Sequence, residues 1–345
     1  MEVSMIGVDL AKNVFAVHGV DANGAVVIRR ELRRAQLLRF FEKLKPCVVG
    51  MEASSGAHHW ARALRALGHE PRLMPASYVK AYVKRGKTDA ADAAAICEAM
   101  TRPTMRFVPV KSVEQQAVLA LHRARDLMVR QRTQASNALR SLCAEFGVVA
   151  AKGRMPLEEL FALIGGAADA RLPSPARAAM LPLIAQHELL CRNIAALERE
   201  IAAKHKTDDA YRRLTTIPGV GPLIASTFVT VVGNVERFGS GRELAAWIGL
   251  TPKANSSGGK HKQSSISKQG DRYLRKLLVQ GANSLLRHVQ TSKTAIAAWA
   301  RELLTRKPKK VVALALANKL ARIVWALLAK GGTYGQPLKA MELAA

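Results

Sequence analysis

Hydrophobic positions in the first part of the chain occur as short runs separated by turn residues. Runs rich in Val and Ile at residues 4–9, 14–20 and 24–30 have the length of strands, and Asp21-Ala22-Asn23-Gly24 is typical of a hairpin turn. Two more strands are expected at Cys47–Glu52 and 71–74, and helices at about 34–44, 57–67 and 88–100, the last with Thr88 as its N-cap. Strands that alternate with helices predict an α/β sheet in this part of the chain.

The pattern changes to that of long helices between residues 113 and 205. Leu190, Ile194, Leu197 and Ile201 are spaced by four, three and four positions, which is typical of a coiled-coil seam. Prolines at 156, 173 and 175 interrupt the helical pattern, so we expect an antiparallel helical arm. The seam is a candidate dimer interface, or it packs within its own chain. The basic face of the arm is either solvated or lies on nucleic acid, and spacing alone leaves both open.

The overall charge indicates a polyanionic partner. The 345 residues include 53 Lys and Arg against 26 Asp and Glu, a formal net charge of +27. Such a charge is costly in self-repulsion and is typical of nucleic-acid-binding proteins. Aromatic residues make up only 5% of the chain, so we expect phosphate contacts to dominate over base stacking.

Cysteine usage and hydropathy point to the cytoplasm. The four cysteines are far apart and form no CxxC pair, which argues against a zinc site and against a disulfide framework. The first residues lead directly into a strand and show no signal-peptide pattern. The apolar segment 311–328 carries Asn318, Lys319 and Arg322, so we expect a basic amphipathic helix rather than a membrane span. A cytoplasmic protein associated with the nucleoid is expected, with no membrane partner.

Two stretches after residue 208 are candidates for phosphate binding. Ile217-Pro218-Gly219-Val220-Gly221-Pro222 precedes an apolar helix and resembles a helix-hairpin-helix turn, in which the backbone around Gly219 and Gly221 would hold a phosphate. An ordinary tight turn between helices explains these six residues nearly as well. Residues 251–290 hold one acid, Asp271, against eight basic residues, which are Lys253, Lys260, Lys262, Lys268, Arg272, Arg275, Lys276 and Arg287. The Ser- and Gly-rich part of this stretch is expected to be a flexible, phosphate-binding loop rather than a passive linker.

Four carboxylates stand where the predicted elements begin or end. Asp9 and Glu52 each end a buried strand, and Asp89 and Asp92 are spaced so that they share one face of a helix. Individually, each acid could cap a helix or pair with Lys12 or Arg62. Together in one α/β domain they indicate an oxygen-ligand site for Mg²⁺ or Mn²⁺. Small residues at Ala90, Ala91 and 93–95 would let this helix approach the sheet closely.

Three acidic motifs in order resemble a known family. Ile6–Lys12, Gly50–Ala53 and Lys87–Ala93 are similar to the successive motifs of DEDD transposases of the Piv and insertion-sequence-110 family, and Ile217–Gly221 and Gly249–Arg275 are similar to its C-terminal domain. The resemblance implies an α/β RNase H-like (RuvC-like) catalytic domain at 1–108, a helical coiled-coil arm at 109–207, and a mostly α-helical C-terminal transposase domain at 208–335. It covers nearly the whole chain.

The same resemblance implies a mechanism. Asp9, Glu52, Asp89 and Asp92 would form the metal-binding tetrad, and Ser257 is the best match to a nucleophilic serine that the family places in a Pro…Ser-Gly context. The enzyme would excise and insert its own element through a phosphoserine link to DNA. An RNA encoded by the element would guide it to its target. Because one tetrad supplies one strand cut, we expect a homodimer that pairs into a tetramer.

Two other classes of function are compatible with these residues. An RNase H-type Holliday-junction or structure-specific nuclease would use the same four acids with water as its nucleophile. A non-catalytic nucleic-acid-binding protein would keep the charge without the chemistry. The C-terminal domain with Ser257 argues against the first class, and the retention of all four acids argues against the second.

Overall fold

The computed structural model describes residues 2–84, 86, 88–151, 153, 155–166, 170–257 and 260–335, and over 254–257 and 260–263 only the backbone is described. The chain folds as two compact units, Met1–Gln116 and a second unit that begins at Ala117. The arm and the C-terminal region lie together in the second unit, and the sequence-based division into three domains stays a prediction.

The first unit is built on a mixed five-stranded sheet. Its strands are β1 (Met5–Asp9), β2 (Val14–Val20), β3 (Val26–Arg33), β4 (Val48–Glu52) and β5 (Glu70–Met74), in the order β3-β2-β1-β4-β5. β1 to β3 form an antiparallel meander, and β4 and β5 run parallel to β1. The predicted α/β, RNase H-like domain is confirmed, including the hairpin turn in which the Asp21 side chain accepts hydrogen bonds from the Asn23 and Ala25 amides.

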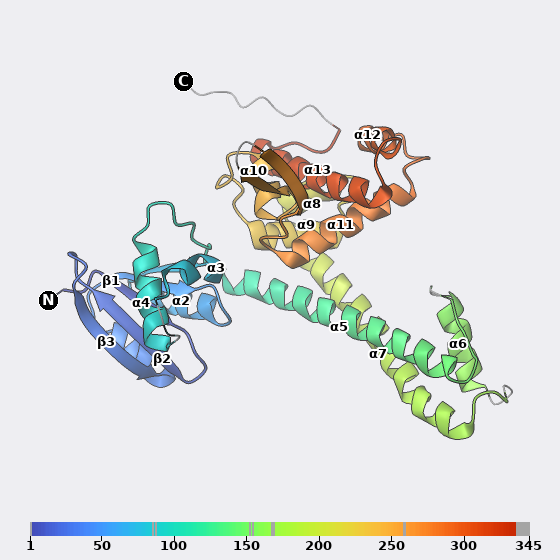
Figure 1. Ribbon diagram of the computed structural model, residues 1–345, viewed down its shortest axis with the longest axis horizontal. Coiled ribbons are helices and arrows are strands. Elements are labelled where there is room, and N and C mark those ends of the chain that lie inside the picture. The colour runs from blue at the N-terminus through green and yellow to red at the C-terminus, as the bar shows by residue number, and fades with distance from the viewer. Residues whose placement is uncertain are drawn as a thin grey trace. The chain divides into compact units, whose positions relative to one another are not determined.

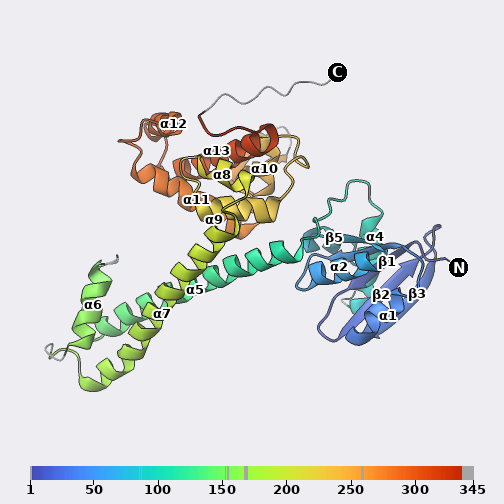
Figure 2. The same cartoon turned by 180° about the vertical axis from the view of Figure 1, so that it is seen from behind.

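Helices cover both faces of this sheet (Figures 1 and 2). The helices of this unit are a 3₁₀ turn at Arg34–Gln36, α1 (Leu37–Phe41), α2 (Ala57–Ala66), α3 (Ala76–Val79), a 3₁₀ turn at Lys80–Tyr82, and α4 (Asp89–Met100). Ile6, Val8 and Phe15 form one core with α1 and α2, and Val20 and Met74 form a second core with α3 and α4. Strand alternation therefore assigns odd positions of β1, such as Gly7 and Asp9, to the α4 face.

Two glycines let α4 lie directly on the sheet. A Cβ atom at Gly7 would collide with the Ala93 carbonyl oxygen of α4 and would lie 2.7 Å from the Cys97 amide nitrogen. A Cβ atom at Gly50 of β4 would collide with the side chain of Met100. At Gly7 the helix meets the strand through the small residues Ala93 and Cys97, in line with the close approach that the sequence predicts. This contact fixes the position of the helix start, where Asp89 and Asp92 lie.

The second unit begins with the helical arm. Its helices are α5 (Val113–Ala144, mostly in this unit), α6 (Met155–Gly165) and α7 (Ser174–Lys204). The prolines act as predicted at Pro173, which is the N-cap of α7, but Pro182 lies inside α7 and α6 was not predicted. Leu190, Ile194 and Ile201 are buried within this chain, and Leu197 is half-buried. The seam is therefore packed in its own chain, and the dimer interface proposed for it is not supported.

The C-terminal core of the second unit is helical. It contains α8 (Asp209–Thr215), α9 (Pro222–Thr227) with a π-helical continuation at Phe228–Val232, α10 (Gly241–Trp247), α11 (Arg272–Arg287), α12 (Ala295–Leu304) and α13 (Lys309–Lys330). In the described part of the chain, α13 alone is long and apolar enough to cross a membrane. Its residues Val312, Leu316, Leu320, Val324 and Leu327 are buried in this core, which explains the apolar stretch.

The predicted flexible loop is instead a β-hairpin, and that expectation was wrong. β6 (Pro252–Ser257) pairs antiparallel with β7 (Lys260–Ile266), and Ser257 lies opposite Lys260. The two residues between the strands are Gly258 and Gly259, which lie outside the described residues. Two glycines between strand-length segments are a strong hairpin signal. The signal was missed because both strands are polar and show no hydrophobic alternation.

A buried polar network joins the arm to the C-terminal core. The ring of His122 in α5 is hydrogen-bonded to the hydroxyl of Ser226 in α9 at 2.9 Å and to that of Tyr273 in α11 at 3.2 Å. Beside it, Arg125 donates from Nε to Glu198 of α7 at 2.7 Å. Burial first, then the charge of Arg125 and His205, lowers the pKa of His122 to about 4. His122 is therefore neutral at physiological pH and serves as a structural hydrogen-bonding group.

We expect Gly7→Ala to loosen α4, because the new Cβ meets helix backbone that cannot move aside. The cost should be about 1–3 kcal/mol, as for overpacked cores. Gly50→Ala is the matched control: its Cβ meets only the flexible Met100 side chain, so it should cost less. Hydrogen–deuterium exchange of peptides from α4 measures both. Equal protection of α4 in the two variants would contradict this account of the packing.

We also expect the second unit to lose stability in mild acid. Because the folded pKa of His122 lies below its usual value of 6.5, its contribution is full above pH 6.5 and is lost as pH falls toward 4. The total effect is on the order of 2 kcal/mol. His122→Gln keeps hydrogen-bonding groups but does not titrate, so its urea midpoint should fall less between pH 7.5 and pH 5. Parallel falls in the two proteins would show that His122 is not responsible.

Candidate metal centre and catalytic serine

Two of the candidate acids lie at the ends of adjacent parallel strands. Asp9 is the last residue of β1 and Glu52 the last of β4, and the register pairs Val8 with Met51 just before them. Each acid follows by two positions a glycine that faces α4, so both carboxylates lie on the α4 side of the sheet. The sequence correctly predicted two acids at one edge of the sheet.

The other two acids lie in the first turn of α4. The Thr88 hydroxyl accepts a hydrogen bond from the Ala91 amide at 3.2 Å, so Thr88 is the N-cap, as predicted. This cap fixes where the helix begins. Ligand oxygens of Asp9, Asp89 and Asp92 then all lie within 4.8 Å of one another. The structure thus brings together three carboxylates separated by about eighty positions in sequence.

Glu52 lies beside this group but not in it. The three-residue cluster does not include its carboxylate. Its pKa is raised, first by burial and then by the negative charges of Asp9 and Asp92. Those two contributions show that Glu52 is near enough to interact with both aspartates. A cation among the four acids would relieve this repulsion and favour the charged form of Glu52.

The donor set fits a hard divalent cation. Carboxylate oxygens are the ligands that Mg²⁺ prefers, and two of them on opposite sides of one ion lie about 4.2 Å apart. The oxygens of Asp9, Asp89 and Asp92 reach this spacing with small side-chain adjustments. Asp89 is exposed and Asp92 half-exposed, so an ion keeps open positions for water or substrate. The acidic cluster is therefore consistent with a divalent metal.

One alternative partner of these acids, Arg62, makes a hydrogen bond elsewhere. Arg62 donates to the Lys111 carbonyl at 2.7 Å rather than to Glu52. Asp89 and Asp92 do lie at a helix N-terminus, where the dipole favours negative charge. That effect reduces the cost of clustering them and is compatible with a metal site.

The candidate nucleophile lies on β6, where the description is limited to the backbone. The base of the hairpin is held to the core: the Ser267 amide donates to the Thr251 carbonyl at 2.8 Å, and the Lys268 amide to the Gly249 carbonyl at 3.1 Å. A Cβ atom at Gly270, where φ is +71°, would collide with the Trp247 carbonyl. Close backbone contact at the base therefore sets the direction of the strand that carries Ser257. The side chains of Ser257, Lys260 and Lys262 lie outside the description.

The predicted phosphate-binding cations separate into two groups. Lys253, Lys268 and Arg272 are exposed. Arg275 instead donates to the Ile248 and Gln269 carbonyls, each at 2.7 Å, and holds the turn before α11. The single acid of the stretch, Asp271, caps α11 by accepting from the Leu274 amide at 2.7 Å. Of the predicted phosphate-binding cations with described side chains, Lys253, Lys268 and Arg272 are thus accessible to a ligand.

The glycine-rich turn before α9 has two different glycines. Gly219 has φ of +84° and packs against the Gly281 carbonyl of α11, so its lack of a side chain is needed for packing. Gly221 is the N-cap of α9 and has open space around its Cα. A hollow of about 560 Å³ lies beside this turn and α11. The turn thus has both a structural glycine and an accessible one.

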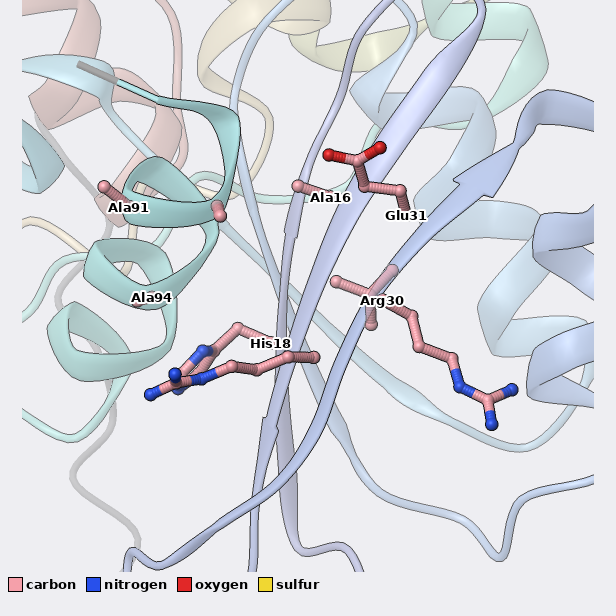
Figure 3. Close-up of a pocket in the computed structure, with 9 residues that line it drawn as sticks. Ala16, His18, Arg30, Glu31, Ala91 and Ala94 are labelled. Carbon is pink, nitrogen blue, oxygen red and sulfur yellow. The ribbon is translucent and has the colours of Figure 1, made fainter.

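A second hollow adjoins the acidic cluster and was missed by sequence reasoning. It lies between α4 and strands β2 and β3, has a volume of about 450 Å³, and is lined in part by His18 and Arg29 (Figure 3). The register pairs these two residues directly. Alternation along β2 and β3 could have placed them on the same face as Asp9, once the antiparallel register was known.

Comparison with known proteins identifies two matching family models. A DEDD transposase model of IS110 type matches residues 6–146, and the model described as Transposase IS116/IS110/IS902 family matches residues 211–297. A "probable family 20 transposase" of Pseudomonas aeruginosa is 48% identical over 97% of this chain and 99% of its own length. The transposase for insertion sequence element IS1111A of Coxiella burnetii is 40% identical over 96% of this chain and 92% of its own length. The transposase for element IS1328 of Yersinia enterocolitica is 39% identical over 97% and 99%.

We expect Glu52→Gln to stabilise the metal-free protein. The folded pKa of Glu52 is raised, so its ionisation costs stability as pH rises above its usual pKa of 4.5. Removing the charge should gain about 0.5 kcal/mol at pH 8, or roughly 1–2 °C in Tm, and nothing below pH 4. Mn²⁺ should then raise the Tm of the native protein more than that of the variant. A variant that is less stable at pH 8 without metal would refute the electrostatic account of this site.

Proposed function

The chain belongs to the IS116/IS110/IS902 family of transposases, and we propose that it moves its own insertion sequence through a covalent phosphoserine link between Ser257 and DNA. It is a DNA phosphoryl-transfer enzyme, as the sequence predicted. The phosphoserine, the metal ion, the guide RNA and the assembly are the parts that we add.

The observation that carries the proposal is the clustering of Asp9, Asp89 and Asp92 within 4.8 Å at the end of a strand and the start of a helix. Glu52 stands beside them. Carboxylates gathered in this way repel one another, although the protein as a whole has a net charge of +27. A divalent cation among them, which we take to be Mg²⁺ or Mn²⁺, would offset this repulsion.

The reaction that follows conserves the number of phosphodiester bonds. The Ser257 oxygen forms a bond to phosphorus, the bond from phosphorus to the leaving strand breaks, and the hydroxyl proton passes to solvent while the leaving oxygen takes one up. A divalent ion, when bound, stabilises negative charge on the phosphoryl oxygens and on the attacking or leaving oxygen. Asp9, Glu52, Asp89 and Asp92 hold and orient it. The serine ester keeps the bond energy, so a second strand can displace the serine without an energy source.

Nucleic acid is bound in this proposal mainly through phosphates. Lys253, Lys268 and Arg272 are exposed and contact the backbone beside the hairpin, with Lys260 and Lys262 on β7 as further ligands. Gly221 leaves the start of α9 accessible to a phosphate, and Gly219 brings that turn close to α11. Arg275 contributes by holding the turn rather than by direct contact.

A guide RNA and a multimer complete the proposal. Members of the family that this chain resembles pair an element-encoded RNA with donor and target DNA, and the net charge is sufficient for RNA and two duplexes. One acidic site per chain cuts one strand, so four cuts held in register require four copies, which we infer to be two paired dimers acting in the bacterial cytoplasm at the nucleoid. A seam other than Leu190–Ile201 must hold them, since that seam is buried in its own chain.

We expect Ser257→Ala to abolish the covalent protein–DNA adduct, because alanine has no oxygen to bond to phosphorus. The adduct is measured as a shifted band on denaturing gels after reaction with labelled DNA from the element end, with Mg²⁺ present. Ser256→Ala is the matched control on the same strand, and it should keep the adduct at least in part.

An adduct formed by the Ser257→Ala protein would show that another residue is the nucleophile. Cleaved DNA without an adduct in the native protein would favour water as the nucleophile, as in RNase H-type nucleases. Asp9→Asn should lose both cleavage and adduct while it keeps the fold, because the amide is nearly isosteric with the carboxyl group but binds a cation weakly. A fully active Asp9→Asn protein would remove the acidic cluster from the mechanism.

A further inference from the structure

The hollow between α4 and the β2–β3 hairpin is continuous with the catalytic face of the sheet. Its floor is formed by side chains of β2 and β3, and its wall by the alanines of α4 that follow Asp89 (Figure 3). The volume of about 450 Å³ lies within the range of small-molecule and nucleotide sites, roughly 300–1,000 Å³. All of its lining belongs to the first unit.

Strand register places the floor of the hollow next to the metal centre. Asp9 pairs with Ala16, which pairs with Glu31, so these three residues form one row across the sheet. Gly7, His18 and Arg29 form the next row. Rows on one face are about 6.8 Å apart and strands about 4.8 Å apart. Arg29 therefore lies two strands and one row from Asp9, on the same face.

Two arginines line the hollow, Arg29 and Arg30, and strand register places Arg29 on the face of the sheet that α4 covers. Arg29 is exposed, and no ion pair joins it to another residue in the described ranges. His18 lies opposite it on β2 and is half-buried. Burial first, and then the charge of Arg29, lowers the pKa of His18, so it is a neutral hydrogen-bonding group here. A guanidinium beside a neutral imidazole matches the oxygens of a phosphate diester.

Glu31 restricts where a phosphate can lie. Its carboxylate is on the row of Asp9, and the structure describes no ion pair for it either. Negative charge at this row repels a backbone phosphate, while Arg29 on the next row attracts one. A strand in the hollow is therefore held with a phosphate at the Arg29 row and away from Glu31, which fixes its register relative to the metal centre.

The wall of the hollow is built from residues too small to fill it. Ala90, Ala91 and Ala94 face this space, and Ala91 and Ala94 are only partly buried. A leucine at any of these positions would bury apolar area that alanine leaves open, with a gain of about 0.8 kcal/mol per buried CH₂ group. The hollow beside the acidic cluster thus stays open, and the folded state is less stable than it would be with larger residues there.

We propose that this hollow holds the DNA strand beside the phosphodiester that is cut, with Arg29 and His18 contacting one of its backbone phosphates. The inference rests on the transposase reaction proposed above and names the residues that set the register of the strand. From the offset between Arg29 and Asp9, about 12 Å, and a rise of about 3.4 Å per nucleotide of one strand, the contacted phosphate lies roughly three or four nucleotides from the cut. Arg29 acts as a positioning residue because it touches the strand but not the reacting atoms.

Single neutral phosphates test this contact in the full-length protein. DNA from the element end is prepared with one methylphosphonate at each of the four positions on either side of the cut. Cleavage rate is measured in Mg²⁺, and the binding constant is measured by fluorescence anisotropy in Ca²⁺. In the native protein, a methylphosphonate at one position three or four nucleotides from the cut should lower the cleavage rate or the binding constant roughly tenfold, the value of one charge-assisted hydrogen bond. In Arg29→Ala the same position should cost less than twofold.

Arg30→Ala is the matched control. Arg30 is adjacent in sequence, has the same charge and also lines the hollow. Strand alternation nevertheless places its side chain on the other face, and Figure 3 shows it extending away from α4. The Arg30→Ala protein should lose affinity for DNA by the same small factor as the Arg29→Ala protein. Its cleavage rate and binding constant should still fall as far as those of the native protein when the methylphosphonate is at the sensitive position. This separates a specific contact from the loss of one positive charge among many.

Each result of the methylphosphonate scan either supports or overturns the contact between Arg29 and a DNA phosphate. Sensitivity lost only in Arg29→Ala supports the proposal, and sensitivity kept in Arg29→Ala overturns it. A flat scan of all eight positions in both rate and binding also overturns it, including the case in which the hollow serves RNA. If the native protein cuts no DNA, the proposed function fails, but the binding scan still decides whether Arg29 holds a DNA phosphate. Ala94→Leu, which fills the hollow without changing charge, should remove the same sensitivity.

Discussion

The contact between α4 and the bare backbone of β1 and β4 is the constraint on which the active-site geometry depends. Gly7 and Gly50 lack the side chains that would hold the helix away, so the backbone of α4 at Ala93 and Cys97 meets Gly7, and the side chain of Met100 meets Gly50. Asp9 and Glu52 follow these glycines by two positions, on the same face of the sheet. The two-residue spacing from glycine to acid therefore has two effects. It lets α4 pack on the strands, and it places the strand-end acids on the face where α4 begins. A change that lifts the helix would separate Asp89 and Asp92 from Asp9 before it unfolded the domain.

The acidic cluster and the charge of the whole protein act in opposite directions on DNA. A net charge of +27 draws a polyanion to the surface and speeds its association. At the cluster itself, the carboxylates of Asp9, Asp89 and Asp92 repel the phosphate that must be cut. A bound divalent cation would offset part of that negative charge and give the phosphate a positive group to contact. Close approach of DNA to the acidic cluster would therefore depend on a bound cation. Binding of DNA to the rest of the protein would not depend on it.

Much of the first unit could be predicted from sequence, because its signals are local. The Val- and Ile-rich runs, the Asp21–Gly24 turn and the Thr88 cap each depend on a few neighbouring residues, and all were confirmed. The meeting of Asp9 with Asp89 and Asp92 was inferred from chemistry and family resemblance, since no local signal places a strand end beside a distant helix. The β6–β7 hairpin was missed because polar strands give no hydrophobic pattern. The hollow with His18 and Arg29 was missed because it exists only in the register between strands.

The alanines of α4 lie on two sides of the helix, and packing constrains only one of these sides. On the side of the helix that faces β1, small residues are required, because the backbone of Gly7 lies in contact with it. On the side that faces β2 and β3, the same contact does not apply, and larger residues at Ala91 and Ala94 would fill the hollow and add buried apolar area. Packing therefore explains Ala93 and Cys97 but not Ala91 and Ala94. A strand of DNA lying in the hollow explains both, because the space must stay open for the backbone that Arg29 and His18 contact.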